Sequence, residues 1–592
     1  MSRTHVWSAI NISVVSLFYM LYMNASYPRV GHDYAYFLPR IFDTYLHYRV
    51  NGISIQWYTP SFGAGLPAYS NPQHIQFSLI QLLGVFSNPW QASLSAVLIF
   101  VSIGYLSTFS LAYRILKLNL FSAHLCALFF VANGFYIQHM AVGHVGFQTF
   151  MLIPLLVVFV LDSKLSRIVS AILIGLTASL MLHSAGFYML IYFVLSINIL
   201  LPLIYLISAP AEPIAHAVMR LGLGLLIFLA VSLSKLNAVA SFLYLFHRIV
   251  ADTYPVTWLS GLFGMMLQYV GVMLTVPLLL LVDKSPMNFI KLLYTFTGAN
   301  HGFWELDMSL SPAVWILLVA GVVGFLKNSH RQVAFSRRNY FLILWLFVAF
   351  YILISFTLAK GGLYYWLSKL PILMSLHVNP RYGSAGILPV ALFGGLIFDR
   401  LIVRNFSARI TLMTYLGFSA ISLASLWAYF ELPLEVSYRS FNVTTLEELY
   451  NESQEKNETF LVNKIVPNIK DYEVFQAKAS NLNIVEPVFG YNLGQYSPQV
   501  MAGSPFKTAG DYLNFTNPAC LVYPIENNCQ PFDRVRIDDR ENLKKLLNRQ
   551  QPDWKISLDQ SISNVISVVS LVICFAILSI HAARNRLNLQ RS

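Results

Sequence analysis

Charged residues are scarce in this sequence of 592 residues. Asp, Glu, Lys and Arg make up 11% of the chain, whereas soluble domains usually carry about 25%. Hydrophobic residues reach 56%, and the mean hydropathy is positive. Several uninterrupted apolar runs approach the roughly 20 residues that a helix needs to cross a bilayer. The composition therefore predicts a polytopic helical membrane protein rather than a soluble one.

Several common signatures are also missing. The sequence has no internal repeat, no low-complexity tract, no phosphate-cradling Gly loop and no Cys/His cluster with metal-ligand spacing. The net charge of +12 does not indicate nucleic-acid binding, because the Lys and Arg residues lie in short loops between apolar spans, where they set topology. The N-terminal MSRTH and the apolar run after it lack a small-residue cleavage site, so the first span is expected to be retained.

Cysteine is rare as well, with four residues in the chain. Cys126 and Cys574 fall within apolar spans, where cysteine behaves as a small core residue. Cys520 and Cys529 lie nine residues apart in a polar segment. A disulfide between them is expected if that segment faces an oxidising compartment.

The apolar runs predict about 12 transmembrane helices. Basic residues gather in alternate connections between these helices, and placing those connections in the cytoplasm leaves both termini inside. The predicted helices lie near residues 6–24, 91–113, 121–137, 147–162, 168–185, 187–208, 219–235, 310–326, 340–358, 384–399, 409–428 and 561–582. The basic residues are Arg114, Lys117, Lys164, Arg167, Lys327, Arg331, Arg337, Arg338, Arg400, Arg404, Arg409, Arg584, Arg586 and Arg591.

This orientation divides the chain into three parts. Residues 1–428 form a transmembrane module whose loops 25–90, 236–308 and 359–383 face outward. Residues 429–560 form an external domain, and residues 561–592 form a last span and a basic cytoplasmic tail. The stretch Leu259 to Val282 is apolar enough to cross, yet a single crossing would reverse the later loops. It is therefore expected to lie in the interface, to re-enter, or to pair with a second crossing.

Residues 429–560 differ in kind from the spans. They are richer in Asn, Glu, Asp and Gln, and short β-like runs at Thr459–Val462 and Ile484–Tyr491 alternate with helical ones. The sequence thus predicts an all-α polytopic bundle that carries a small external mixed α/β domain.

The polar stretch from Gly31 to Gln73, after the first span, carries the strongest candidate for chemistry. The spacing of Asp33, Tyr36, Phe37 and Arg40 suits one helix along the membrane surface. A carboxylate at a helix start is favoured in its ionised form and suits a general base. The alternative is that Asp33 only caps the helix. The candidate substrate-binding residues in this stretch are His32, Tyr34, Arg40 and Trp57.

Two histidines in the run NGFYIQHMAVGHVGFQ invite a metal interpretation. His139 and His144 are five residues apart, not at the i, i+4 spacing of a helical zinc pair, and no third ligand is evident. The sequence therefore favours hydrogen-bonding and packing roles, with His144 as a candidate substrate contact and no metal.

Cations at the ends of spans are candidates for holding a phosphate. Lys235 is expected to end a span, Arg248 follows an apolar stretch, and Arg381 opens a span; each could pair with a phosphate at the bilayer edge. The alternative is interfacial anchoring by snorkelling. Nearby candidates for substrate contacts are His247, Trp304, Glu305 and Asn379, with Glu305 a second acid or a sugar-binding carboxylate.

Taken together, these segments resemble the GT-C superfamily of integral-membrane glycosyltransferases, and more narrowly its bacterial YfhO-like branch. The resemblance rests on GHDYAYFLPR, the run WYTPSFGAGLP with Asn71-Pro72, ANGFYIQHMAVGH, KLNAVASFLYLFHR, HGFWE and LPILMSLHVNPRYG. It implies a catalytic Asp in the first external loop, here Asp33, a polyprenyl-phosphate sugar donor, and inversion at the anomeric centre. Many relatives carry a second acid two residues further on. Here that position is Ala35, so a metal-independent mechanism is expected.

The resulting hypothesis is glycosyl transfer on the periplasmic face of a bacterial inner membrane. Asp33 acts as base, Arg248, Arg381 or Lys235 binds the donor phosphate, and the acceptor is a glycan, lipid or protein. No cofactor and no nucleic acid take part. A transporter or flippase of lipid-linked saccharides is the rival, and a membrane scaffold that binds glycan is a third option.

Overall fold

The computed structural model describes residues 3–23, 33–208, 212–246, 303–305, 307–327, 337–359, 361–369, 378–431, 443–482 and 499–591. The predictions about Leu259–Val282 and about a β-run at Ile484–Tyr491 lie outside these residues.

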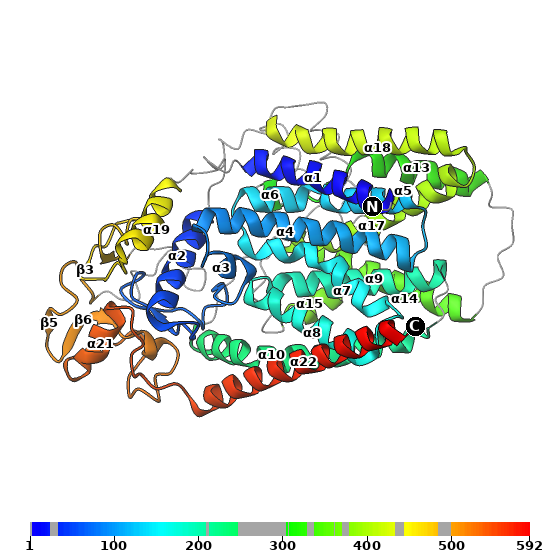
Figure 1. Ribbon diagram of the computed structural model, residues 1–592. Coiled ribbons are helices and arrows are strands. Elements are labelled where there is room, and N and C mark those ends of the chain that lie inside the picture. The colour runs from blue at the N-terminus through cyan, green and yellow to red at the C-terminus, as the bar shows by residue number, and fades with distance from the viewer. Residues whose placement is uncertain are drawn as a thin grey trace.

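Long apolar helices dominate the described residues and pack side by side (Figure 1). Nine of the helical spans there are long and apolar enough to cross a membrane, and three more are apolar but shorter. The prediction of a mostly helical membrane protein is confirmed at this level, while the count of 12 spans stays a prediction. The helices of the bundle are α1 (Arg3–Met23), α4 (Pro89–Ser110), α5 (Leu120–Val131), α6 (Gly134–Ala141), α7 (Ile153–Leu161), α8 (Arg167–His183), α9 (Phe187–Ile207), α10 (Ile214–Leu245), α13 (Pro312–Lys327), α14 (Arg337–Thr357), α15 (Gly362–Leu367), α17 (Ile387–Phe398), α18 (Ala408–Ala428) and α22 (Leu558–Arg591).

Short helical turns extend several of these helices. They are η1 (Leu111–Ile115), η2 (Val145–Leu152), η3 (Phe303–Glu305), η4 (Asn379–Gly386), η5 (Asp399–Val403) and η6 (Tyr429–Glu431). Two predicted boundaries are wrong, because α10 continues ten residues past the predicted end at 235 and α22 outlasts the predicted 561–582. In α10 the error comes from Lys235, a polar residue inside the helix whose amine is satisfied by backbone carbonyls of another segment.

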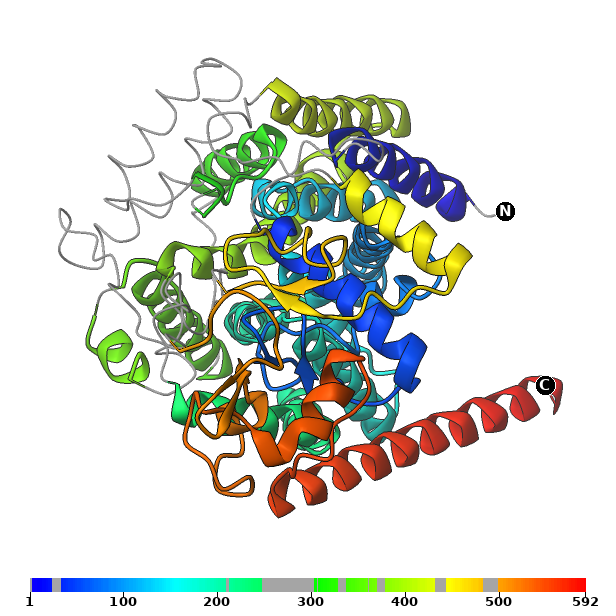
Figure 2. The ribbon, with the colours of Figure 1, turned by 90° about the vertical axis from the view of Figure 1, so that its left-hand side faces the viewer.

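The segment between α1 and α4, called the first-loop segment (33–88), lies at one end of the bundle (Figures 1 and 2). It contains α2 (Tyr34–Asn51), α3 (Leu79–Leu83) and a two-stranded antiparallel hairpin of β1 (Tyr58–Thr59) and β2 (Leu66–Pro67). Gly65 adopts φ +108°, and a Cβ there would lie 2.8 Å from the carbonyl oxygen of Thr516. A glycine is needed at this position because the two backbones approach so closely.

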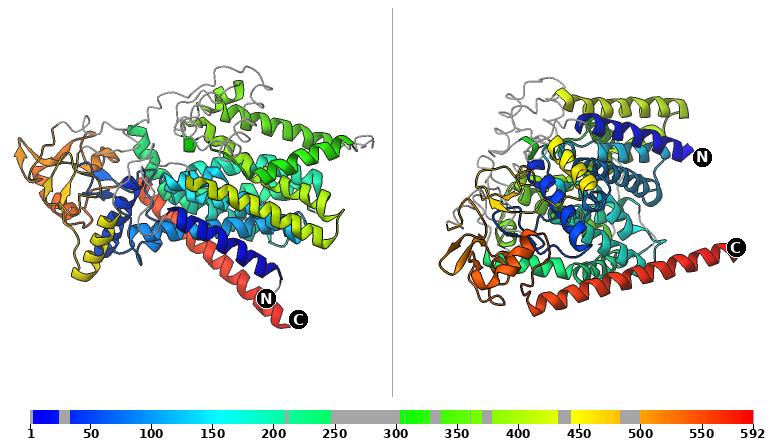
Figure 3. Two further views of the ribbon diagram at one scale, coloured as in Figure 1. Left: turned by 90° about the horizontal axis from the view of Figure 1, so that it is seen from above. Right: turned by 60° about the vertical axis from the view of Figure 1, so that its left-hand side comes forward.

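The C-terminal unit (443–482 and 499–557) lies at the same end as the first-loop segment, opposite both termini (Figure 1; from above in Figure 3). It is mixed α/β. Its elements are α19 (Thr444–Lys456), the parallel pair β3 (Lys464–Ile465) and β4 (Ala479–Ser480), the antiparallel sheet β5 (Thr508–Ala509), β6 (Tyr512–Thr516) and β7 (Arg534–Arg536), then η8 (Pro518–Leu521), η9 (Ile537–Asp539) and α21 (Arg540–Leu547). The strand predicted at 459–462 is absent there, and β3 begins at Lys464 instead.

A buried ion pair and a buried amine hold the first-loop segment in place. Arg549 Nη1 contacts Asp43 Oδ1 at 2.5 Å, and both side chains are 3% exposed. Lys235, in the middle of α10, donates through Nζ to the carbonyl oxygens of Tyr69 at 2.6 Å and Asn71 at 2.8 Å. These contacts tie α2 to the C-terminal unit and the following loop to the bundle, which fixes the platform for the candidate site.

Candidate functional site

Asp33 stands at the start of α2, as the sequence predicts, but it does not cap the helix. Its side chain makes no capping hydrogen bond. Instead its Oδ2 lies 3.4 Å from Nε2 of His144, and the side chain is 37% exposed. Gly143 adopts φ +81°, and a Cβ there would lie 2.4 Å from the backbone nitrogen of Tyr34. The glycine thus lets the turn before His144 press against the start of α2.

His144 is buried next to a second imidazole. Its ring centroid lies 5.0 Å from that of His139. Burial lowers the pKa of His144 to about 3 and outweighs the opposing effect of the Asp33 carboxylate, so the imidazole is neutral at physiological pH. A neutral imidazole carries one N–H. With that proton on Nε2, His144 can orient the Asp33 carboxylate.

His139 has its own backbone partner. Nδ1 lies 2.7 Å from the carbonyl oxygen of Phe135, and because a carbonyl can only accept, Nδ1 carries the proton. Nε2 then faces Oε2 of Glu305 at 3.5 Å. The ring is also stacked on Phe147, with centroids 4.3 Å apart. The orientation of His139 is therefore fixed from both sides, with Nε2 aimed into the site.

Glu305 and Arg381 form the charged wall of the site. Arg381 donates through Nε and Nη2 to the two carboxylate oxygens of Glu305, the bidentate geometry of a strong pair. Trp304 Nε1 donates to Oε1 of Glu305 at 3.0 Å. Burial would raise the pKa of Glu305, but the Arg381 guanidinium and the two neighbouring imidazoles together outweigh it and hold that pKa well below its usual range. Glu305 is therefore ionised.

The cluster has the donor set of a cation site. One ligand atom each of His139, His144 and Glu305 lies within 4.8 Å of the others. His139 Nε2 and His144 Nδ1 are buried and have no hydrogen-bond partner among the described residues. Two imidazoles and a carboxylate are a common set for Zn²⁺, with the second nitrogen of each ring held by an outer partner. The third ligand was not evident in the sequence because Glu305 comes from a segment far along the chain, and the expectation of no metal stays a prediction.

The structure brings five of the predicted site residues together: Asp33, His144, Trp304, Glu305 and Arg381. Asp33 contacts His144, Arg381 contacts Glu305, and ligand atoms of His144 and Glu305 lie within 4.8 Å of each other. Acid and guanidinium thus meet in one cluster at the end of the bundle that carries α2.

Two predicted contacts do not reach this cluster. The Tyr34 ring is 0% exposed and packs edge-on against Trp90, so stacking on a sugar is excluded in this conformation. Lys235 does not end a span. Its amine is buried, with Tyr69, Asn71 and His74 carbonyl oxygens within 3.3 Å of Nζ, which leaves no N–H for a phosphate.

Three further predicted site residues instead make contacts that hold neighbouring segments together. Arg40 donates to Asp471 Oδ2 at 2.8 Å in the C-terminal unit. Asn379 donates to the Phe356 carbonyl oxygen at 3.0 Å and also to Tyr364. Trp57 packs edge-on against Tyr69 and Tyr523. The predicted residues His32, His247 and Arg248 lie outside the described residues.

Sequence reasoning missed two features. It gave His139 no role in the site, because its partner Glu305 is distant in sequence. It also missed the Asp43–Arg549 pair. Arg549 follows α21 in a polar segment, and nothing in the sequence around it indicates that its partner is Asp43.

No family model matches the sequence, and neither does any curated protein. Similar solved structures include the arabinofuranosyltransferase AftD from Mycobacteria, with 13% identity and a TM-score of 0.43 over 79% of this chain. The oligosaccharyltransferase from Archaeoglobus fulgidus has 14% identity and a TM-score of 0.38, covering 80% of this chain and 64% of that one. ArnT from Cupriavidus metallidurans, bound to undecaprenyl phosphate, has 13% identity and a TM-score of 0.41, covering 83% and 88%.

The chain spans 30% of the length of AftD. Likenesses at this level do not establish a family for the chain. The resemblance to the GT-C superfamily and its YfhO-like branch stays a prediction.

Proposed function

We propose that the protein is a membrane glycosyltransferase that moves a sugar from a polyprenyl-phosphate donor to a cell-envelope acceptor. The observation that carries this proposal is the Asp33 carboxylate. It is partly exposed, it is held 3.4 Å from His144, and it shares a cluster with the Glu305–Arg381 pair. The cluster lies where apolar helices end, so a lipid-borne donor can reach it from the bilayer.

Asp33 takes the role of general base. Its carboxylate accepts the proton of the acceptor hydroxyl while that oxygen attacks the anomeric carbon of the donor sugar. The bond from the anomeric carbon to the phosphate oxygen breaks, and polyprenyl phosphate leaves with the electron pair. Attack from the face opposite the leaving group inverts the anomeric centre. His144 acts on this step through Asp33, whose carboxylate it orients.

Arg381 takes the role of neutralising the departing phosphate. Its Nε and Nη2 are engaged by Glu305, which holds the guanidinium plane in place and leaves Nη1 for a ligand. Positive charge placed where negative charge develops lowers the barrier of the transfer step. A cation bound by His139, His144 and Glu305 would supply further positive charge at the same place.

The direct test is to replace the carboxylate with its amide. Asp33→Asn keeps the shape of the side chain and removes its basicity, so transfer of labelled sugar from the lipid carrier should fall by about a hundredfold or more. Asp538→Asn is the matched control, because that side chain is 73% exposed in the C-terminal unit. Undiminished turnover in Asp33→Asn would remove Asp33 from the base role.

A further inference from the structure

A cavity of about 160 Å³ opens between the first-loop segment and the C-terminal unit. Its walls include Trp57 and Tyr58 from one side and Gln550, Gln551 and Trp554 from the other. None of these residues belongs to the Asp33 cluster. The cavity therefore calls for its own explanation.

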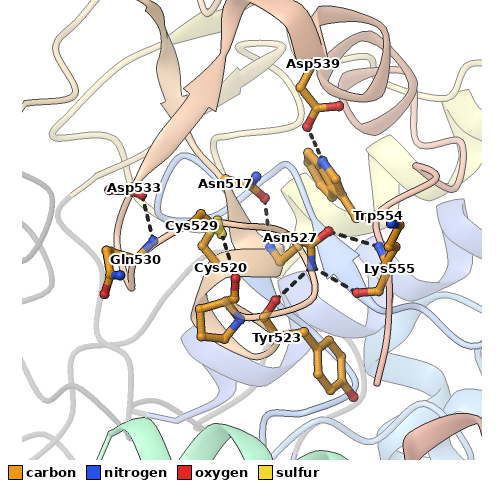
Figure 4. Close-up of a disulfide and its surroundings, with 12 residues drawn as sticks. Asn517, Cys520, Tyr523, Asn527, Cys529, Gln530, Asp533, Asp539, Trp554 and Lys555 are labelled. Atoms are coloured by element: carbon orange, nitrogen blue, oxygen red, sulfur yellow. Dashed lines mark hydrogen bonds between the residues drawn. A yellow bond between two sulfur atoms is a disulfide. The ribbon is translucent and has the colours of Figure 1, made fainter. Parts of the chain in front are cut away.

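The aromatic walls are rigid. The rings of Tyr58 and Trp554 meet edge-on with centroids 5.4 Å apart, and the Trp554 indole N–H donates to Asp539. The segment after Trp554 is clamped to the disulfide loop, because Lys555 N donates to Asn527 Oδ1 at 3.0 Å and Asn527 Nδ2 donates to the Lys555 carbonyl oxygen at 3.0 Å. Asn527 lies within the loop that the Cys520–Cys529 bond closes (Figure 4).

The one guanidinium at the cavity is already neutralised. Arg549 contacts Asp43 through Nη1 and donates to Ser61 Oγ at 2.9 Å and to the Thr459 carbonyl oxygen at 2.8 Å. Every guanidinium nitrogen of Arg549 thus has an acceptor already, whereas Nη1 of Arg381 has none among the described residues. The cavity thus selects against phosphate and for a ligand without net charge.

The polar groups that a ligand can reach in the cavity are amides. The Tyr58 hydroxyl oxygen is fully buried, so a ligand meets the ring of Tyr58 and not its hydroxyl. Gln550 and Gln551 are exposed and present their amides at the rim.

Aromatic rings beside amide groups are the complement of a sugar. The C–H face of a sugar ring packs on an aromatic ring, while its hydroxyls bond to Gln side chains. The volume of about 160 Å³ equals roughly five water molecules at about 30 Å³ each. It suits one ring rather than a chain.

We propose that this cavity binds one neutral sugar ring of a glycan. His47, on the cavity wall, follows Asp33 by 14 residues in sequence, which along a helix is about 20 Å. The bound ring is therefore a distal unit of the acceptor, not the unit that reacts. The claim of binding stands on the cavity, while the role as acceptor site rests on the proposed glycosyl transfer.

Saturation-transfer NMR on the full-length protein tests the binding. The probes are methyl glycosides of glucose, galactose, mannose and N-acetylglucosamine, and the protein is held in an amphipol, because maltoside detergents would compete. We expect saturation transfer to at least one glycoside. Gln550→Ala should weaken that binding by about fivefold, the effect of one net hydrogen bond, and Gln550→Trp, which fills the rim, should abolish it.

Gln530→Ala is the matched control, because Gln530 is exposed in the same unit and does not line the cavity. No transfer to any of the four glycosides, or equal transfer in wild type, Gln550→Ala and Gln550→Trp, would overturn the proposal. Asp33→Asn separates the two proposals. It should lose turnover and keep glycoside binding, so retained turnover contradicts the base role alone.

Discussion

At the scale of single residues, the net charge of the candidate site determines which ions it binds. Asp33 and Glu305 bring two carboxylates, whereas Arg381 brings one guanidinium and the buried His144 is neutral. Within the part of the chain that the structure describes, the cluster thus has an excess of negative charge and two imidazole nitrogens without hydrogen-bond partners. A divalent cation satisfies both conditions at once.

We expect the purified protein to bind about one Zn²⁺ per chain, held by His139, His144 and Glu305. After chelation and dialysis against trace Zn²⁺, mass spectrometry of the metal should show loss of the ion in His144→Ala and its retention in His144→Cys, since a thiolate can replace the imidazole. His581→Ala, near the end of α22, is the control. Equal zinc in wild type and His144→Ala would show that this cluster is not the site.

The sequence allowed several charged residues of the site to be predicted, but not which residues they contact. Asp33, Glu305 and Arg381 stand out because each is a charge in an apolar chain, and such charges need a reason. The pairing of Glu305 with Arg381 and His139 could not be predicted, because it depends on how distant segments meet. Tyr34 was predicted to contact substrate, because an aromatic ring can either bind a ligand or pack in the core. In the structure its ring packs against Trp90 in the core.

At the scale of elements, α2 links the candidate site to the C-terminal unit. It begins at Asp33 and carries Asp43 along the same helix. The partner of Asp43 is Arg549, just after α21, and both side chains are buried. Removing one member of a buried pair leaves an uncompensated charge, at a cost of roughly 3–5 kcal/mol. The pair therefore fixes the position of α2.

We expect this pair to make stability depend on acid. Burial would raise the pKa of Asp43, but Arg549 and the hydroxyls of Ser61 and Thr59 together outweigh it, so the folded pKa lies below the ordinary value. The stabilisation is present above the unfolded pKa, near 3.9, and is lost as the pH falls through that value toward the folded pKa. The melting temperature should thus fall more steeply on acidification in wild type than in Asp43→Asn.

Two further variants complete this test. Arg549→Met should lower Tm more than the double variant Asp43→Asn/Arg549→Met, because the double variant leaves no buried charge. Glu452→Gln, in the exposed pair with Lys456, should leave Tm nearly unchanged. Equal Tm values for Arg549→Met and the double variant would contradict a coupled pair.

Elements of different length were predictable to different degrees. Long apolar helices are visible in sequence because they need only local hydrogen bonds and some 20 apolar residues. The two-residue strands β1 to β5 carry no such pattern, since each depends on its partner strand. Even α10 was cut short in the prediction because Lys235 looks like a helix end. Its amine is satisfied by backbone carbonyls of another segment instead.

At the scale of the whole molecule, the two ends of the bundle differ. One end carries the first-loop segment and the C-terminal unit, and both chain termini lie at the other (Figures 1 and 3). The disulfide Cys520–Cys529 belongs to the first end. The opposite end carries basic residues such as Arg114 and Arg404, which contact Asp162 and Asp399. This asymmetry is what a cytoplasmic terminal end and an oxidising outer end produce.

Cysteine labelling in intact cells tests that orientation. Met501→Cys places a thiol in the C-terminal unit, where the native residue is 54% exposed, and Lys164→Cys places one in the exposed connection between α7 and α8. The native Cys126 and Cys574 are buried, so the wild type gives the background. A membrane-impermeant maleimide should label Met501→Cys in intact cells and Lys164→Cys only after permeabilisation.

The reverse pattern would put Asp33 and Arg381 on the cytoplasmic side. A donor on a polyprenyl phosphate could still reach them there, but the acceptor would have to be cytoplasmic, and the disulfide would lie in a reducing compartment. Labelling of both thiols before permeabilisation would place 164 and 501 on one side of the membrane. The apolar helices between them would then cross an even number of times, which contradicts their arrangement at opposite ends of the bundle.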